Sequence, residues 1–112
     1  MYKPILNNSD EITDFIIEFA CSPIDEELIR EYFRGCIAIL KSIDISYLQE
    51  GDESQNIRCI KKEMRYERLP IETMPPLIVE NGIVTDGNHR LRVARKNGVK
   101  KIAVYDIVPT TT

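Results

Sequence analysis

No long run of apolar residues occurs in this sequence, and its beginning has neither the basic start nor the apolar core of a signal peptide. A helix that crosses a bilayer needs about 20 mostly apolar residues. A signal peptide needs roughly 7 to 15 in its central part. We therefore expect a cytoplasmic protein that does not span a membrane.

Cysteine and histidine are scarce. The three cysteines, Cys21, Cys36 and Cys59, lack the close spacing of zinc sites and disulfide frameworks, and His89 is the only histidine. Free cysteines usually behave as small buried apolar residues. The sequence therefore predicts no structural zinc. A nuclease would need a cluster of metal ligands, and the scattered carboxylates form none that can be recognised.

The charges are unevenly distributed along the chain. Residues 1–56 hold 4 basic and 12 acidic residues, a balance of −8, whereas residues 57–112 hold 11 basic and 6 acidic residues, a balance of +5. The C-terminal half is therefore where an anion would bind, unless the two halves simply attract one another. With 112 residues, 43% of them apolar, the chain can bury one core, and residues 1–112 are predicted to form a single domain.

Residues 1–35 are predicted to form a helical N-terminal extension. Asn8 followed by Glu11 resembles a capping box, and a stripe of apolar residues follows on one helix face, namely Ile12, Phe15, Ile16 and Phe19. A second helix is expected to begin at Pro23 and to stop at Gly35. Its predicted buried residues are Ile24, Leu28 and Phe33. These stripes indicate core packing or a groove that binds a partner protein.

Residues 36–108 are predicted to form the core of the domain. A nearly continuous apolar run over 36–45 favours a buried strand, and Gly51 with Asp52 favours a turn. Ser54 can cap a helix whose outer face is basic and is interrupted by Glu63 and Glu67. This basic ridge consists of Arg58, Lys61, Lys62, Arg65 and Arg68.

The remaining segments have the clearest local signals. Pro70, Pro75 and Pro76 prevent a helix and favour an extended approach to the next strand. Residues 77–80 and 83–86 are predicted to pair as a hairpin across the two-residue turn Asn81-Gly82. A helix should then run to about Asn97 and stop at Gly98, and 99–108 should return as a strand.

Asp86-Gly87-Asn88-His89-Arg90 joins the hairpin to that helix and has the features of an anion site. A glycine lets the backbone pass close to a bound group, and the first amides of a helix point outward with the positive end of the helix dipole behind them. The side chains of His89 and Arg90 could flank the same phosphate. Asp86 could hold a metal ion or act as a general base, or it could only cap the helix. His89 could instead be a core or capping histidine.

This order of elements resembles the ParB/sulfiredoxin-like superfamily. The resemblance implies a small α+β domain with a mixed sheet and packed helices, to which the two N-terminal helices are an addition. It also implies that the Gly-x-His-Arg turn, Gly87, His89 and Arg90 here, grips nucleotide phosphates. The matching residues are Pro75, Pro76, Leu77, Ile78, Val79, Asp86, Gly87, Asn88, His89, Arg90, Ala94, Gly98 and those at 102–105.

Departures from the branches of this superfamily restrict the chemistry. Sulfiredoxins carry a reactive cysteine where this chain has Asn88, and an amide cannot supply a thiolate, so sulfinic acid repair is not expected. The partition branch reads Gly-Glu-Arg-Arg, which this chain lacks. The Asp-Gly-x-His-Arg motif is most similar to that of the branch of free-serine kinases. In that branch an acidic residue near the motif acts in phosphoryl transfer.

The leading hypothesis is therefore nucleotide-dependent phosphotransfer or hydrolysis with ATP or another nucleotide and Mg²⁺, on a small hydroxyl-bearing substrate. Asp86 is the predicted metal ligand and, with Glu63, a candidate acid or base. The predicted nucleotide-binding residues are Gly87, Asn88, His89, Arg90, Lys61, Lys62 and Arg65. Weak or no binding of nucleic acid is expected. The alternatives are a non-catalytic DNA-associated or regulatory protein, a ParB-like nuclease, and a domain that binds a partner protein through its N-terminal helices.

Overall fold

A five-stranded mixed sheet organises the computed structural model, which describes residues 2–18, 25–51 and 74–110. The strand order is β1-β2-β5-β3-β4, where β3 runs parallel to β5 and the other neighbours are antiparallel. This arrangement confirms the predicted α+β class. The strands are β1 (Ile5–Leu6), β2 (Cys36–Asp44), β3 (Leu77–Glu80), β4 (Ile83–Asp86) and β5 (Lys101–Pro109).

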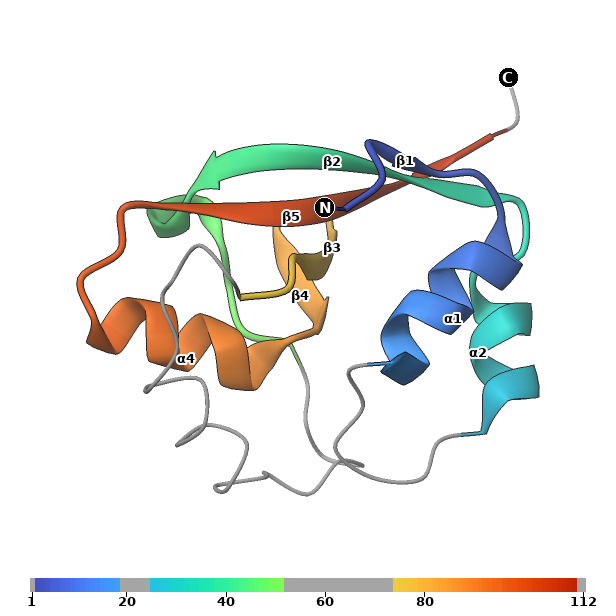
Figure 1. Ribbon diagram of the computed structural model, residues 1–112, viewed down its shortest axis with the longest axis horizontal. Helices are drawn as coiled ribbons and strands as arrows, with labels where there is room; N and C mark the ends of the chain where they lie inside the picture. The colour runs from blue at the N-terminus through green and yellow to red at the C-terminus, as the bar shows by residue number, and fades with distance from the viewer. Residues whose placement is uncertain (1, 19–24, 52–73, 111–112) are drawn as a thin grey trace.

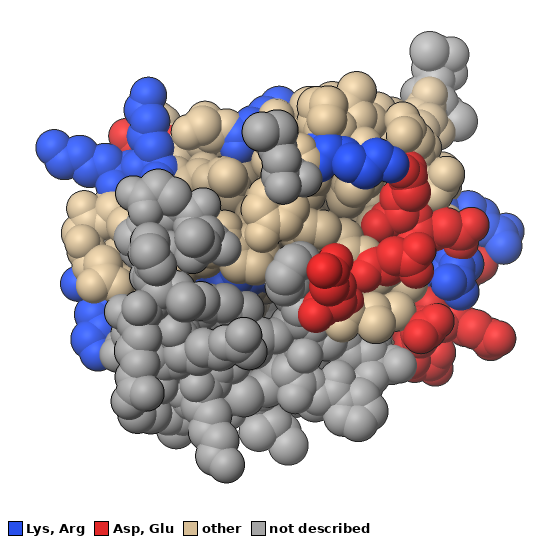
Figure 2. Space-filling view, in the orientation of Figure 1, with Lys and Arg blue, Asp and Glu red and all other residues tan. Residues whose placement is uncertain are grey.

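Three described helices lie on the same side of the long β2 and β5 strands, with α4 (Asn88–Lys96) at one end and α1 (Ser9–Glu18) and α2 (Glu26–Tyr32) at the other (Figure 1). Figure 2, in the same orientation, shows Asp and Glu side chains gathered at the end of α1 and α2. The buried residues accordingly form two clusters. One includes Leu91 of α4 and Val104 of β5, and the other includes Ile12 of α1 and Tyr105 of β5. No helix among the described residues is long and apolar enough to cross a membrane.

The hairpin of β3 and β4 confirms the clearest sequence signal. Asn81 and Gly82 have φ angles of 52° and 80°, the left-handed conformation that a two-residue hairpin turn requires at both positions. Asparagine and glycine adopt this conformation at low cost. The predicted strand at 36–45 and the helix that stops before Gly98 are also confirmed, as β2 and α4.

The start of α1 has the predicted cap. Asn8 Oδ1 accepts from Glu11 N at 2.9 Å, and Glu11 Oε2 accepts in turn from Asn7 N at 2.9 Å. Both bonds satisfy backbone donors near the helix start, although the return bond goes to Asn7 rather than Asn8. Ile12, Phe15 and Ile16 are buried as predicted. The preceding strand β1 was not predicted, because two residues are too few to form a pattern.

The prediction for α2 was wrong in its start and in one buried residue. Asp25 has an extended conformation and caps the helix by accepting from Leu28 N at 3.1 Å, so the helix begins at Glu26 and not at Pro23. With this start, Ile29 and Phe33 face the core, one turn apart. Leu28 is one position, or about 100°, away from Ile29 and is 67% exposed.

Several sequence predictions lie outside the described residues. These are the helix that follows Ser54, its basic ridge and Glu63, and the expected burial of Phe19, Ile24, Cys21 and Cys59. The division into an extension at 1–35 and a core at 36–108 stays a prediction.

Residues 48–51, named the strap here, follow the short 3₁₀ helix η1 (Ile45–Tyr47) and lie along the outer edge of β4. Gln49 N donates to Gly82 O and Val84 N donates to Gln49 O, each at 2.9 Å. Gly51 approaches β4 so closely that a Cβ atom there would lie 2.0 Å from Val84 O. A glycine is therefore required for the strap to cover this edge of the sheet.

Replacing Gly51 with alanine should lower the free energy of unfolding by about 3 kcal/mol, because the strap would have to move off the β4 backbone. Gly35→Ala is the control: Gly35 has φ 75°, but no atom lies within 4 Å of the place that an added methyl group would take, so only about 1 kcal/mol of backbone strain is expected. Chemical denaturation would measure both losses. Equal losses would contradict the close approach of the strap.

Candidate functional site

The turn between β4 and α4 is built around Gly87. This residue has φ 110° and ψ 21°, which is left-handed, and it directly precedes the first residue of α4. A Cβ atom at Gly87 would lie 2.7 Å from Leu77 Cδ2 and 2.9 Å from Arg90 Nη2. The expected glycine turn is present. The side chains of Leu77 and Arg90 fill the space beside the glycine.

Arg90 is the most buried charged residue of the motif, with 3% of its surface exposed. Its Nη1 donates to the backbone oxygens of Pro75 at 3.0 Å and Pro76 at 2.8 Å, and its Nη2 forms an ion pair with Asp86 Oδ2 at 2.9 Å. The guanidinium therefore joins the approach to β3, the end of β4 and the first turn of α4. Phosphate binding by Arg90 stays a prediction, and a ligand would share the guanidinium with these three acceptors.

Asp86 is positioned by that ion pair. The N-cap of α4 is Gly87, which has no side-chain cap hydrogen bond, so the interpretation of Asp86 as the helix cap is wrong. Arg90 lies one turn further along, where a residue at i+4 can reach the carboxylate. A role as a general base or metal ligand is untested.

Asn88 holds the strap in place. Its side chain is buried, and its Oδ1 accepts from Gly51 N at 3.0 Å while its Nδ2 donates to Gly51 O at 3.5 Å. The carboxamide thus forms hydrogen bonds with the backbone N–H and C=O of Gly51, as a neighbouring β-strand would. The predicted contact of Asn88 with a nucleotide is not tested by this arrangement, but the side-chain amide already has two protein partners.

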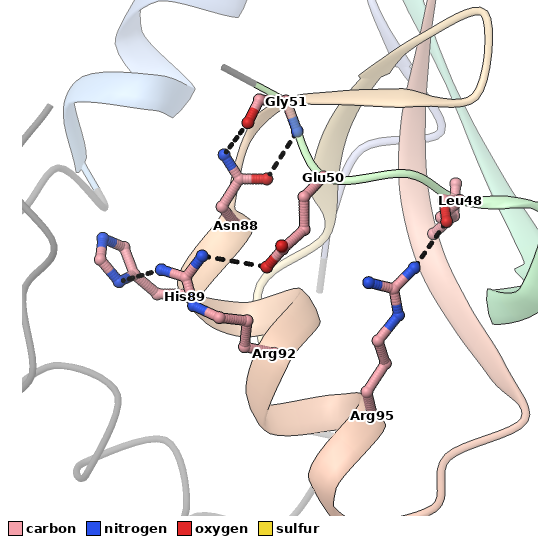
Figure 3. A network of polar contacts seen from close by, with 7 residues as sticks. All are labelled: Leu48, Glu50, Gly51, Asn88, His89, Arg92 and Arg95. Carbon is pink, nitrogen blue, oxygen red and sulfur yellow. Dashed lines mark hydrogen bonds and ion pairs between the residues drawn. The ribbon is translucent and has the colours of Figure 1, made fainter. Parts of the chain in front are cut away.

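His89 and Arg92 lie beside each other on α4, next to the strap (Figure 3). Arg92 Nη1 donates to Glu50 Oε1 at 3.0 Å, and Arg92 Nη2 lies 3.1 Å from His89 Nδ1. Because a guanidinium can only donate, Nδ1 is the acceptor, and the ring hydrogen of a neutral imidazole is on Nε2. The hydrogen on Nε2 lies on the side of the ring away from Arg92.

Arg95 completes the attachment of the strap, since its Nη2 donates to Leu48 O at 2.6 Å (Figure 3). Asn88, Arg92 and Arg95 follow the spacing i, i+4, i+7, which places them on one face of α4. The role of this polar face and of Glu50 was not predicted. The spacing was visible in the sequence, but the segment that it binds is nearly forty residues away in the chain.

Among the described residues, the turn offers few ligands for a metal ion. They contain no group of three or more His, Cys, Asp or Glu side chains that could hold a metal. One oxygen of Asp86 already accepts from Arg90. A Mg²⁺ ion at this turn would therefore be held largely by phosphates and water, as is usual for nucleotide sites. Lys61, Lys62, Arg65 and Glu63 lie outside the described residues.

Replacing Arg90 with methionine should lower the free energy of unfolding by about 3 kcal/mol or more, because Asp86 and two backbone oxygens would lose a buried charged donor. Arg92→Met is a matched control on the same helix: its pair with Glu50 is partly exposed, so a loss of about 1 kcal/mol or less is expected. Thermal and urea unfolding would give both values. Similar losses would argue against a structural role for Arg90.

No family model matches the sequence, and no curated protein matches it either. Two solved structures of the pNOB8-like ParB N-domain are similar to it, with a TM-score of 0.56 each. They are 24% and 23% identical to this chain and cover 64% of it. The chain matches 30% and 28% of their lengths, so it corresponds to less than a third of either. The chain therefore has a ParB N-domain-like fold, as the sequence motifs predicted.

Proposed function

We propose that this domain binds a nucleotide, or a related phosphate compound, at the N-terminal end of α4. One contrast within the molecule supports the proposal. The helices α1 and α2 begin with the side-chain caps Asn8 and Asp25 and have acidic residues in the first turn. The helix α4 begins with Gly87, which has no side-chain cap, and has no acidic residue in its first turn. The first turn of α4 thus carries no carboxylate of its own, and Asp86, just before it, is paired with Arg90.

Neighbouring donors favour the same ligand. His89 holds a ring hydrogen on Nε2, and Arg92 is fixed beside it by Glu50. These groups and the first-turn backbone could bind the oxygens of a phosphate. Arg90 acts in this proposal as a positioning residue, because its contacts with Asp86 and with the oxygens of Pro75 and Pro76 hold the turn in shape. The cations Lys61, Lys62 and Arg65 are proposed to add charge for a polyphosphate.

We further propose that the domain catalyses phosphotransfer from ATP or the hydrolysis of ATP. Such reactions depend mainly on positioning and on neutralising the charge of the transferred group. Asp86 would be the ligand for a Mg²⁺ ion bound with the nucleotide, and Asp86 or Glu63 would act as the acid or base. Magnesium would supply charge neutralisation at the phosphates.

A ParB-like DNA-associated or regulatory role is the second candidate. The fold is that of a ParB N-domain, and the end of α4 and the start of β5 expose four basic residues, Arg95, Lys96, Lys100 and Lys101. Exposed cations of this kind bind the backbone of nucleic acids without reading sequence. Only weak binding is expected, because the whole chain has a net charge of −3.

Calorimetric titration with ATP, ADP, CTP and inorganic phosphate, with Mg²⁺ present, should reveal at least one ligand that binds with a free energy of about −8 to −4 kcal/mol. His89→Ala should weaken that ligand by about 1 kcal/mol, because the phosphate would lose a hydrogen-bond donor. Arg34→Ala is the control, since Arg34 is an exposed cation that pairs with Glu31 at the end of α2.

Two results would contradict the proposed site. The first is the absence of binding by all four ligands at millimolar concentration. The second is a sub-micromolar complex with duplex DNA whose affinity falls by orders of magnitude between about 50 and 200 mM salt, which would favour the DNA-associated role.

Asp86→Asn tests the catalytic form of the proposal. We expect the release of ADP from ATP, measured with a panel of hydroxyl-bearing metabolites, to fall about a hundredfold or more, because an amide holds magnesium poorly. The melting temperature should fall as well, since Arg90 would lose its charged partner, so rates must be normalised to the folded fraction. Asp106→Asn is the matched control, because Asp106 pairs with Lys41 on the sheet. Unchanged turnover in Asp86→Asn would remove this residue from the catalytic set.

A further inference from the structure

The outer face of α2 exposes two large apolar side chains. Leu28 is 67% exposed and Tyr32 is 62% exposed. They are four residues apart, so they lie next to each other on one face of the helix. The face about 100° further around the helix, with Ile29 and Phe33, packs against the core. No residue of α2 itself is buried, so much of this helix faces solvent.

Tyr32 is exposed but fixed in position. Its hydroxyl donates to Glu80 Oε2 at 3.0 Å, and its ring packs edge-on against Phe33 with centroids 4.8 Å apart. The hydrogen bond to Glu80 raises the pKa of the Tyr32 phenol, because it favours the protonated form. Glu80 is itself positioned by Thr85, whose hydroxyl donates to the same oxygen. A side chain held in this way loses little conformational entropy when a partner covers it.

The surroundings of this face are acidic. Glu27 and Glu31 flank Leu28 and Tyr32 on α2, and Glu80 lies at the Tyr32 hydroxyl. Figure 2 shows the acidic side chains gathered over this end of the molecule. The carboxylates of Asp14, Glu18, Glu26 and Glu27 have no cationic partner among the residues that the structure describes. A segment that covers this face must therefore bring positive charge as well as apolar side chains.

We propose that the outer face of α2, formed by Leu28, Tyr32, Glu27, Glu31 and Glu80 and named the α2 patch, binds a lysine- or arginine-rich amphipathic segment of another protein. Exposed apolar side chains beside charges of one sign are typical of such grooves and faces. The negative charge disfavours nucleic acids and anionic membranes, which carry the same sign. A rigid exposed tyrosine is also the kind of side chain that contributes most to protein interfaces.

A pair of synthetic peptides would test this proposal on the full chain. The first is a helix of about four turns with leucines on one face and lysines on the other. The second has the same composition in a scrambled order, so that it keeps the charge but has no apolar face. Fluorescence anisotropy should show at least about tenfold tighter binding of the first peptide. Moderate salt should weaken both peptides, because each depends on charge.

Variants of the protein would show where on its surface the amphipathic peptide binds. Leu28→Ala combined with Tyr32→Ala should weaken the amphipathic peptide about tenfold or more, whereas Tyr47→Ala should change its affinity less than about twofold. Tyr47 is 77% exposed and lies outside the α2 patch, so it is a matched aromatic control. Tyr32→Phe keeps the ring but loses the bond to Glu80, so an intermediate effect is expected. Because Leu28 and Tyr32 are exposed, all these variants should fold, which circular dichroism would verify.

Three results would overturn the proposal. Equal affinity for the two peptides would mean that charge alone attracts them. An unchanged affinity in the double variant would place the contact elsewhere on the molecule. Sedimentation of the protein alone could also reveal a dimer that the double variant abolishes, in which case a second copy of this chain, and not another protein, covers the α2 patch.

Discussion

The ion pair between the buried Arg90 and the partly exposed Asp86 is the interaction on which the rest of this site depends. The guanidinium binds the oxygens of Pro75 and Pro76 as well as Asp86, so one side chain fixes three segments of the chain. A buried charge is costly unless it is paired and hydrogen-bonded, and here its partners come from the residues that build the turn. A Cβ atom at position 87 would collide with this guanidinium and with Leu77, so the close contact requires a glycine. The position and shape of the positive end of α4 follow from that contact.

The motif thus has an inward and an outward part. Gly87, Asn88 and Arg90 contact the protein itself, whereas His89 projects on another side of the helix beside Arg92. Consecutive helix positions differ by about 100° in direction, so Asn88, His89 and Arg90 point to three different sides of α4. A sequence motif identifies the residue types but not which of them face the protein. Asn88 and Arg90 contact the fold, and their contact with a ligand stays a prediction.

Local signals allowed much of the fold to be predicted, and non-local contacts account for what was missed. The Asn81-Gly82 turn, the Asn8 cap and the left-handed Gly98 each depend on residues close in sequence. The strap could not be predicted, because Gly51 and Asn88 meet only in the folded chain. Leu28 was expected in the core because the predicted helix included Ile24, one turn before Leu28 on the same face, whereas α2 begins at Glu26.

The ion pairs of the described residues mostly join two residues of the same half of the chain. In the N-terminal half, Lys3 pairs with Glu11, Arg30 with Asp10 and Arg34 with Glu31. In the C-terminal half, Arg90 pairs with Asp86. Between the halves, Arg92–Glu50 joins a cation of the basic half to the acidic half, and Lys41–Asp106 has the opposite arrangement. One pair uses a cation of the basic half and the other an anion of that half. Together they therefore leave the difference in net charge between the halves unchanged. Four of these six ion pairs thus lie within one half of the chain, and our two proposals assign the remaining charge to an anion at α4 and a basic segment at α2.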